Sequence, residues 1–490
     1  MHMSSADRLA MLVIMHHILP KEQKTKQEPF IYVAPVLRTA LLLGVCGGFA
    51  LATVLTLTQA SGVTEGAWWE ATAQAHGHLQ LYGWAGLFVL GVTLHFLPRL
   101  RGTPLSHAQF IPWLLFIMAS GLVLRAISQP LLALQHIIIW RVLLILSGGL
   151  EFIALLGIVG LLLLTALHGP RARSRPAYWG VLPLLIGAFS ALTIATTSNL
   201  FNSIQAASSA GLVLPTGDTL NTTLGLFGFL IPMALAMSAR SLPMYAGLEA
   251  FPQRLLWPMT MLYLLGLLLF CLSLAITMFS ALAAQLCGGL GLLAMGATTL
   301  LFIAVFLSMM RKRGKLPQKV VRLAPTPTQL AQSYRRQIRN EQANYGPFVA
   351  LVASAYLWAI LGSLLLLLDG VAQLAGLNMP FALDAIRHSF AIGFIALLIC
   401  GIAPRMLPGF SGGHIASAGL VTATLWLGNA ATFLRVGSIL LAPWLATLHS
   451  GSLDMLLFGL SGPLGLALAA CLAINLWPAL TSHDTEARIV

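Results

Sequence analysis

Twelve long apolar segments constrain this chain more than any other feature of its sequence. A helix that crosses a bilayer needs about 20 apolar residues, and each segment is close to that length or longer. Hydrophobic residues make up 58% of the chain and charged residues 8%, so a water-soluble fold could not bury all the apolar side chains. The sequence therefore predicts an all-α membrane protein with twelve transmembrane helices. The segments are 35–58, 71–97, 108–128, 136–166, 178–200, 218–240, 254–278, 281–310, 347–369, 381–406, 415–441 and 451–479.

One residue pattern occurs three times among these segments. From His78, glycine stands at offsets +5, +13 and +24, and a Leu-Pro pair stands at +19 and +20. The same residues stand at the same offsets from His388, and a third copy that begins at Thr223 lacks only the glycine at +13. Because the copies fall on the second, sixth and tenth segments, they predict three four-helix units in one orientation. The predicted parts are the N-terminal segment 1–34, the units 35–166, 178–310 and 347–479, the basic linker 311–346 between the last two units, and the tail 480–490.

The basic residues predict how the chain is oriented in the membrane. The formal net charge is +13, and by helix count the basic loops, the N-terminal segment and the linker share one side. The positive-inside rule then places both termini in the cytoplasm, and we expect a multi-pass protein of the inner cell membrane. No basic face with interleaved aromatic residues marks a nucleic-acid surface, so the expected partner is the lipid bilayer and not a nucleic acid.

Four arginines lie within or at the ends of segments on the side from which the loop bias should exclude them. They are Arg125, Arg141, Arg387 and Arg435. An arginine inside the bilayer costs about 3 kcal/mol on insertion scales, so it usually marks an anionic partner or a polar site. Glu151, Asp369, Asp384 or the membrane interface could satisfy any one of them. Four together, two of them at +47 from His78 and His388, favour an anionic cofactor or ligand.

His78 and His388 occupy corresponding positions in two copies of the pattern. They therefore lie at the same depth, about 10 Å into the membrane at 1.5 Å per residue. Two neutral imidazoles at one level of a helix bundle are what axial ligation of a haem iron requires, whereas a single buried histidine is more often a hydrogen-bonded packing residue. The arginines lie in the right half of the membrane for the haem carboxylates. His76 points about 200° away from His78 on a helix, where it could bind a different metal or cap polar loop groups.

These features resemble subunit I of the haem-copper oxidase and nitric oxide reductase superfamily. The resemblance is carried by the H-G-H start of the second span, the histidine and glycine pattern of the tenth, and the exits FLPRLRG (96–102) and MLPGFSG (406–412). In that superfamily one histidine of helix two and one of helix ten hold the low-spin haem. The resemblance implies these roles for His78 and His388.

Residues of the oxygen-reducing centre are absent from the pattern. The oxidases use a histidine on helix six, a His-His pair near helix seven and a histidine two residues before the helix-ten ligand. This chain has Thr223 in the helix-six copy, no histidine in the segment 255–266, and Ile386 before the helix-ten histidine. A retained fold without that centre is similar to the NnrS family, twelve-helix membrane proteins that contain haem and copper and are linked to nitric oxide stress.

The resemblance to the NnrS family implies a membrane protein that binds haem, which we expect to be of the b type. Such a protein would respond to or detoxify nitric oxide, or pass electrons from a redox partner through a bis-histidine haem. The resemblance also implies copper, for which the residues alone indicate no site. Two alternatives stay open at this point. One is a divergent oxidase or nitric oxide reductase subunit I, and the other is a transporter of an anionic substrate, although transporters more often show inverted repeats.

Overall fold

The computed structural model describes residues 28–311 and 339–486, apart from residues 64, 247–249, 378, 380, 382 and 448–450. In these residues it has twelve helices long and apolar enough to cross a membrane, which confirms the predicted all-α class. Residues 1–27 of the predicted N-terminal segment and residues 312–338 of the predicted linker lie outside the described residues. The predicted boundaries 1–34 and 480–490 cut into helices, because the first helix begins at Glu28 and the last ends at Glu486.

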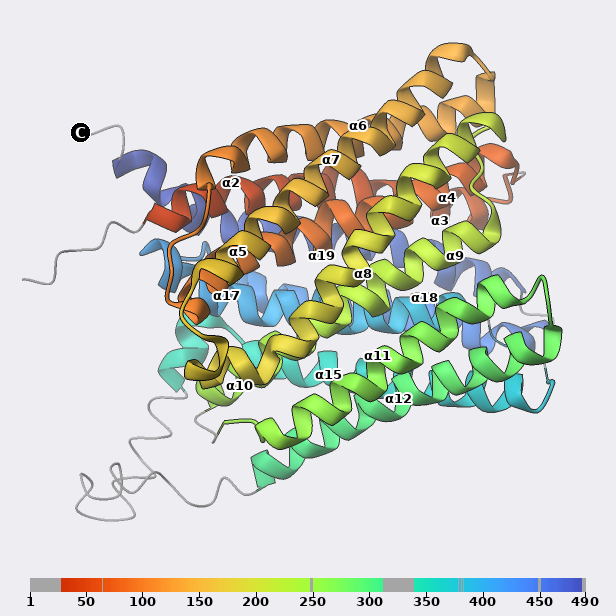
Figure 1. The fold of residues 1–490 in the computed structure, drawn as a ribbon. Helices are drawn as coiled ribbons and strands as arrows, with labels where there is room; N and C mark the ends of the chain where they lie inside the picture. Colours follow the sequence, from red (N-terminus) through yellow and green to blue (C-terminus); the bar gives the residue numbers. More distant parts are fainter. Residues whose placement is uncertain are drawn as a thin grey trace, which may run out of the picture.

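The helices form three units of four membrane spans, as the repeated pattern predicts (Figure 1). The first unit contains α2 (Glu28–Leu43) with η1 (Gly44–Phe49) and α3 (Ala50–Ala60), α4 (Ala67–His78) with η2 (Leu79–Gly86) and α5 (Leu87–Arg101), α6 (Ile111–Gln135) and α7 (Ile138–His168). The second contains α8 (Pro176–Ser208), α9 (Pro215–Thr223) with η5 (Leu224–Leu230) and α10 (Ile231–Ala246), α11 (Gln253–Ile276) and α12 (Ala281–Arg311). The third contains α15 (Phe348–Leu374), α16 (Leu383–His388) with η7 (Ser389–Ala396) and α17 (Leu397–Ser411), α18 (Ala418–Thr447) and α19 (Gly451–Glu486). Short 3₁₀ turns, η3 (Ala108–Phe110) and η4 (Ala172–Ser174), lie in the connections.

The three units close into a ring. The last helix of each unit packs against the first helix of the next: α7 on α8, α12 on α15, and α19 on α2 and α3. The first and last membrane spans that the structure describes therefore lie side by side, as Figure 1 shows. Because the number of spans is even, α2 begins and α19 ends at the same end of the bundle.

The second span of each unit lies inside this ring. In the most apolar stretch of each span, 89%, 89% and 78% of the residues of the second, sixth and tenth spans are buried, against 28–61% in the other nine. These three spans carry the copies of the repeated pattern. The pattern therefore marks the inner wall of the ring, where side chains meet protein and not lipid.

Each copy of the pattern contains a π-helical segment at the same place. The segments η2, η5 and η7 begin at the residue after His78, Thr223 and His388. A π segment holds an extra residue within a helix, and such segments occur frequently at functional sites. The coincidence of three of them at one offset supports the repeat independently of the sequence matches.

The glycines of the pattern have identifiable roles in packing. At +13, a Cβ on Gly91 would lie 2.9 Å from Leu37 Cδ2, and one on Gly401 would lie 3.0 Å from Leu351 Cβ. Glycine there lets the second span approach the first span of its own unit. At +24, Gly102 and Gly412 end their helices in the left-handed region, with φ of 66° and 72°, a conformation that glycine adopts without steric cost.

Candidate cofactor site

A cavity of about 410 Å³ lies toward the end of the bundle where α4, α9 and α16 begin. All three units contribute to its wall, with α3 and α4 from the first, α9 and η5 from the second, and α16, η7, α18 and α19 from the third. Cavities that hold cofactors and drug-sized ligands have volumes of about 300–1,000 Å³, and they are mostly apolar with a few placed polar groups. Here the polar groups include three histidines and three arginines: His76, His78, His388, Arg125, Arg387 and Arg435.

His388 is oriented by a carboxylate one helical turn earlier. Its Nδ1 lies 2.9 Å from the main-chain oxygen of Asp384 and 3.1 Å from Asp384 Oδ1. Arg435 Nη2 donates to Asp384 Oδ2 at 2.5 Å, so the carboxylate is itself held by a cation. A histidine fixed at Nδ1 by an oxygen presents Nε2 as its lone-pair nitrogen, which is the arrangement found in metal-ligating histidines.

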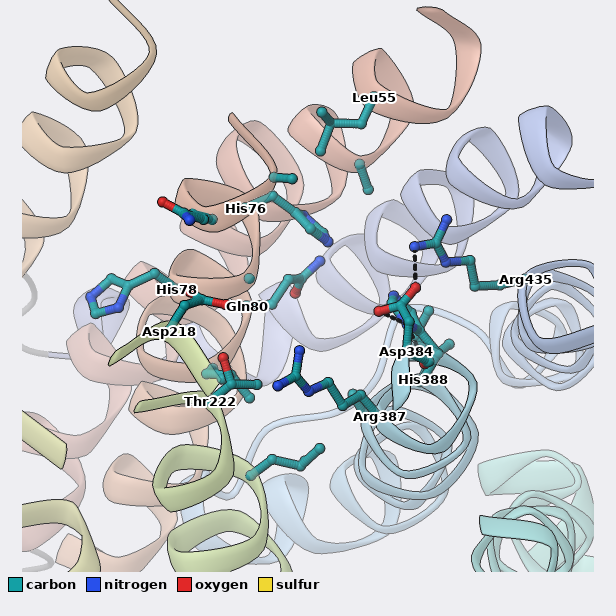
Figure 2. Close-up of a pocket in the computed structure, with 18 of the residues that line it drawn as sticks. Leu55, His76, His78, Gln80, Asp218, Thr222, Asp384, Arg387, His388 and Arg435 are labelled. Carbon is teal, nitrogen blue, oxygen red and sulfur yellow. Dashed lines mark hydrogen bonds and ion pairs between the residues drawn. The ribbon is translucent and has the colours of Figure 1, made fainter. Parts of the chain in front are cut away.

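His76 has the same arrangement on the opposite wall. Its Nδ1 donates to the carbonyl oxygen of Gly48 at 2.8 Å, and no described residue bonds its Nε2. In Figure 2 the imidazole points into the cavity toward His388 and Arg435.

His78 points the other way. Its Nε2 is hydrogen-bonded to Glu151 Oε2, and Figure 2 shows its ring directed away from His388. Glu151 is fully buried and also accepts from Asn199 Nδ2 at 3.2 Å. His78 therefore touches the margin of the cavity while its imidazole belongs to a polar cluster in the first and second units.

The ring of units explains why two histidines at one depth do not face each other. Equivalent residues of units related by rotation point the same way around the ring. His388 on α16 lies next to α18 of its own unit, and His78 on α4 correspondingly lies next to α6 and α7. Sequence offsets give equal depth, but they do not give a common direction.

The four predicted arginines have different surroundings. Arg435 is paired with Asp384, and buried Arg125 donates to Asn199 Oδ1 at 2.6 Å and Ser203 Oγ at 3.1 Å. Arg387 points into the cavity (Figure 2), and its buried Nη2 has no hydrogen-bond partner among the described residues. Arg141 is exposed and is not part of the cavity wall, so the structure does not bring it to the other three.

The cavity also has polar residues that were not predicted from the sequence, and three of them are labelled in Figure 2. Gln80, Asp218 and Thr222 all line it and point into it in Figure 2. Gln80 Oε1 is buried without a hydrogen-bond partner among the described residues. Two features of the sequence could have pointed weakly to these residues as part of the site. Gln80 stands only two residues after His78, and Asp218 is the single acidic residue in its span.

The metal-ligating and hydrogen-bonding groups in this cavity fit a haem better than a bare metal ion. Two imidazoles with fixed Nδ1 atoms offer nitrogen ligands from opposite walls, and the unpaired Arg387 Nη2 offers a hydrogen-bond donor to an anionic group. Within the part of the chain that the structure describes, no three His, Cys, Asp or Glu side chains form a group that could hold a metal ion. The implied copper therefore has no such ligand set there.

Comparisons with known proteins agree with the fold. No sequence family matches the chain, and no curated protein matches it either. Among solved structures, the chain is similar to one from a cryo-EM structure of a heme-copper terminal oxidase dimer, with a TM-score of 0.68 and 11% sequence identity. The match covers 92% of this chain and 84% of the oxidase chain. The chain is a twelve-helix, multi-pass membrane protein with a haem-copper oxidase-like fold.

Proposed function

We propose that this protein binds a b-type haem in the cavity, with His388 as one axial ligand and a histidine of α4 as the other. The observation that carries the proposal is that His76 and His388 are each held at Nδ1 by an oxygen and leave Nε2 available in one cavity. The sequence pattern favoured His78 as the second ligand. The geometry supports His76 instead, because Glu151 occupies the Nε2 of His78 and its ring points away from His388.

Arg387 and Arg435 are the cations that would face the haem carboxylates. Arg387 Nη2 is a buried donor with no hydrogen-bond partner among the described residues, and Arg435 lies over the Phe458 ring at 4.3 Å while it donates to Asp384. Arg387 is half-buried and its charge also acts on Asp218 and Asp384, so an anionic ligand would add the acceptor that its Nη2 lacks among the described residues. Arg125 donates from Nη1 to Asn199 and Ser203, while its buried Nε has no hydrogen-bond partner among the described residues.

A haem held by His388 and a histidine of α4 would supply one-electron transfer when bound. The protein's contribution is to fix both imidazoles and to surround them with apolar walls. We propose a role of the NnrS type, in the response to nitric oxide or its detoxification, or in electron transfer with a redox partner. The haem-copper oxidase-like fold supports this class of function, and the nitric oxide role rests on the resemblance of the sequence.

Two other functions make different demands on the same residues. A divergent oxidase or nitric oxide reductase subunit would need a second metal centre, yet Thr223 and Ile386 replace histidines that the superfamily pattern requires there. A transporter of an anionic substrate would use Arg387 and the cavity without haem. The unpaired Arg387 Nη2 is the observation that keeps this second candidate in view.

The reduced-minus-oxidised absorption spectrum of the purified protein tests the proposal. We expect a low-spin b-type spectrum that is lost in His76→Ala and His388→Ala and retained in His78→Ala. The exposed His168, which contacts only its own helix through Leu164 O, provides a matched control as His168→Ala.

Each other outcome has a defined meaning. Loss of the spectrum in His78→Ala with retention in His76→Ala would return the second ligand to His78. Haem-replete expression that yields folded protein without any haem absorption would overturn the proposal and make anion uptake through Arg387 the next measurement. A change in the spectrum on adding nitric oxide would support gas binding.

A further inference from the structure

Two arginines meet at the end of the bundle opposite the cofactor cavity, where α5 ends and α8 begins (Figure 1). Arg101 is the last residue of α5, and Arg175 directly precedes α8. A Cβ on Gly169, in the connection before α8, would lie 2.8 Å from Arg101 Nε, and a Cβ on Gly102 would lie 2.1 Å from Arg175 Nη2. Each guanidinium therefore packs against a glycine beside the other arginine's segment, and glycine alone leaves room for it.

The loop bias of membrane proteins does not account for Arg101. Basic residues that follow this bias lie in solvated loops, and Arg171, Arg173 and Arg175 are indeed exposed. Arg101 is only 4% exposed, and its Nε and Nη1 are buried without a hydrogen-bond partner among the described residues. Its guanidinium lies over the Tyr178 ring at 4.7 Å. Buried charges are normally paired, so Arg101 lacks an anion.

The third copy of the repeated pattern shows what this position contains elsewhere. Arg101 and Ser411 both stand at offset +23, and Ser411 is 5% exposed. Ser411 Oγ donates to Leu407 O at 3.2 Å and accepts from Gly413 N at 3.0 Å, so this buried side chain is satisfied within its own segment. The fold thus buries the position in both copies, and the arginine of the first copy leaves two donors for an acceptor from outside the chain.

The surrounding segments supply further positive charge and no protein anion. The stretches 96–110, 166–182 and 251–262 contain no acidic residue. Arg173 lies over the Trp179 ring at 5.4 Å, and the N-terminus of α8 adds the positive end of a helix dipole. The planar fork of a guanidinium matches the oxygens of a phosphate group. These features favour an anion that carries phosphate.

The apolar surface beside these cations indicates where the phosphate comes from. Leu163 and Leu167, one turn apart on α7, are exposed and lead toward Gly169. The rings of Trp179 and Trp257 are 4.9 Å apart on α8 and α11, and tryptophan is typical of the headgroup level of a bilayer. A phospholipid has both a phosphate group and apolar chains, whereas a soluble phosphate would leave the apolar surface unused.

We propose that this corner of the bundle binds the headgroup phosphate of an anionic phospholipid, with Arg101 and Arg175 as the contacting cations and the acyl chains along the exposed face of α7. Basic pockets between transmembrane helices bind anionic headgroups in this way. The site goes beyond the proposed haem function and does not depend on it, because the cofactor cavity lies at the other end of the bundle.

Native mass spectrometry of the delipidated full chain in detergent tests the site by titration with phosphatidylglycerol or phosphatidylcholine of equal acyl length. We expect the first phosphatidylglycerol to bind about tenfold more tightly than the first phosphatidylcholine, as hydrogen bonds to a charged group imply. Arg101→Ser, which introduces the residue of the third copy, should abolish this preference. Arg175→Ser alters an exposed side chain and should also reduce the preference, so it serves if Arg101→Ser does not fold.

Arg171→Ser is the matched control, because it removes the same charge from an exposed side chain of the same connection and should change the preference less than about twofold. Equal affinity for the two lipids in the unaltered chain would overturn the proposal. Equal losses in Arg101→Ser and Arg171→Ser would also overturn it, because charge alone would then attract the lipid. Displacement of phosphatidylglycerol by an equal concentration of inorganic phosphate would exclude a lipid as the ligand. Haem absorbance is measured separately, so failure here would leave the axial-ligand proposal standing, and the reverse also holds.

Discussion

Replacing Glu151 by leucine tests the buried polar cluster that holds His78. Glu151 is fully buried, and 3% of Arg125 is exposed. Asn199 connects the two, since its Nδ2 donates to Glu151 at 3.2 Å and its Oδ1 accepts from Arg125 at 2.6 Å. The Glu151→Leu variant therefore removes the carboxylate that Asn199 links to Arg125, leaves Asp218 as the other acidic group that acts on Arg125, and removes the hydrogen-bond partner of His78 Nε2.

The expected loss follows from the removal of that carboxylate. Removing one member of a buried ion pair typically costs about 3–5 kcal/mol, because the remaining charge is uncompensated, whereas replacing both members by apolar residues is close to neutral. Because Asn199 lies between Glu151 and Arg125, this range is an upper limit, and Glu151→Leu should lower the free energy of unfolding by up to about 3–5 kcal/mol. The double variant Glu151→Leu with Arg125→Met should recover most of this, giving a coupling energy of at least about 2 kcal/mol in a double-mutant cycle.

Unfolding in detergent, followed with a thiol-reactive fluorophore, measures both values. Cys400 is fully buried in α17 and reports global unfolding once the more accessible Cys46, Cys271, Cys287 and Cys471 are replaced by serine. If Glu151→Leu unfolds like the unaltered chain, the cluster does not stabilise the fold. If the double variant is less stable than both single variants, the two charges do not compensate each other, and the reasoning fails.

Two further predictions concern the anion site and the packing of the helices. Arg387→Met should lower the fraction of protein that retains haem, measured as haem absorbance per protein. Arg141→Met alters an exposed arginine outside the cavity and should leave this fraction unchanged. Equal retention of haem in both variants would show that Arg387 does not contribute to the site. Gly291→Ala should lower the free energy of unfolding by about 1–3 kcal/mol, because its Cβ would lie 2.6 Å from Gly266 O. Gly149→Ala meets no atom within 4 Å and should be neutral or stabilising by up to about 1 kcal/mol; similar melting temperatures for both glycine variants would contradict this account.

Membrane spans could be predicted from the sequence because hydrophobic length alone determines them. All twelve predicted segments correspond to helices, although many helices extend several residues further than the apolar runs. The exact helix ends could not be predicted in this way. Helices extend beyond the apolar run, as the ends at Glu28 and Glu486 show, and hydrophobicity does not mark where they stop. The organisation into three units could also be predicted from the sequence, because the repeated glycine offsets reflect close helix contacts such as that of Gly91 with Leu37.

The directions of side chains could not be predicted in the same way. The sequence indicates that His78 and His388 are equivalent, but only the closed ring shows that equivalent residues point toward different neighbours. The π segments add to the difficulty, since one extra residue turns the rest of a helix by about 100°. For the same reason the pairing of Arg435 with Asp384 and the unpaired donor of Arg387 became visible only in three dimensions.

A ring of three like units creates three like compartments, one between each unit and the next. In this chain the compartment between the third and first units is hollow and carries His388 and His76, whereas its counterpart beside α6 and α7 is filled by the Glu151 cluster. Each compartment has its own set of second-span residues, so one can gain or lose a cofactor while the shared scaffold stays intact. Replacing Glu151 and Arg125 by apolar residues would be the first step in building a second cofactor site into the same protein.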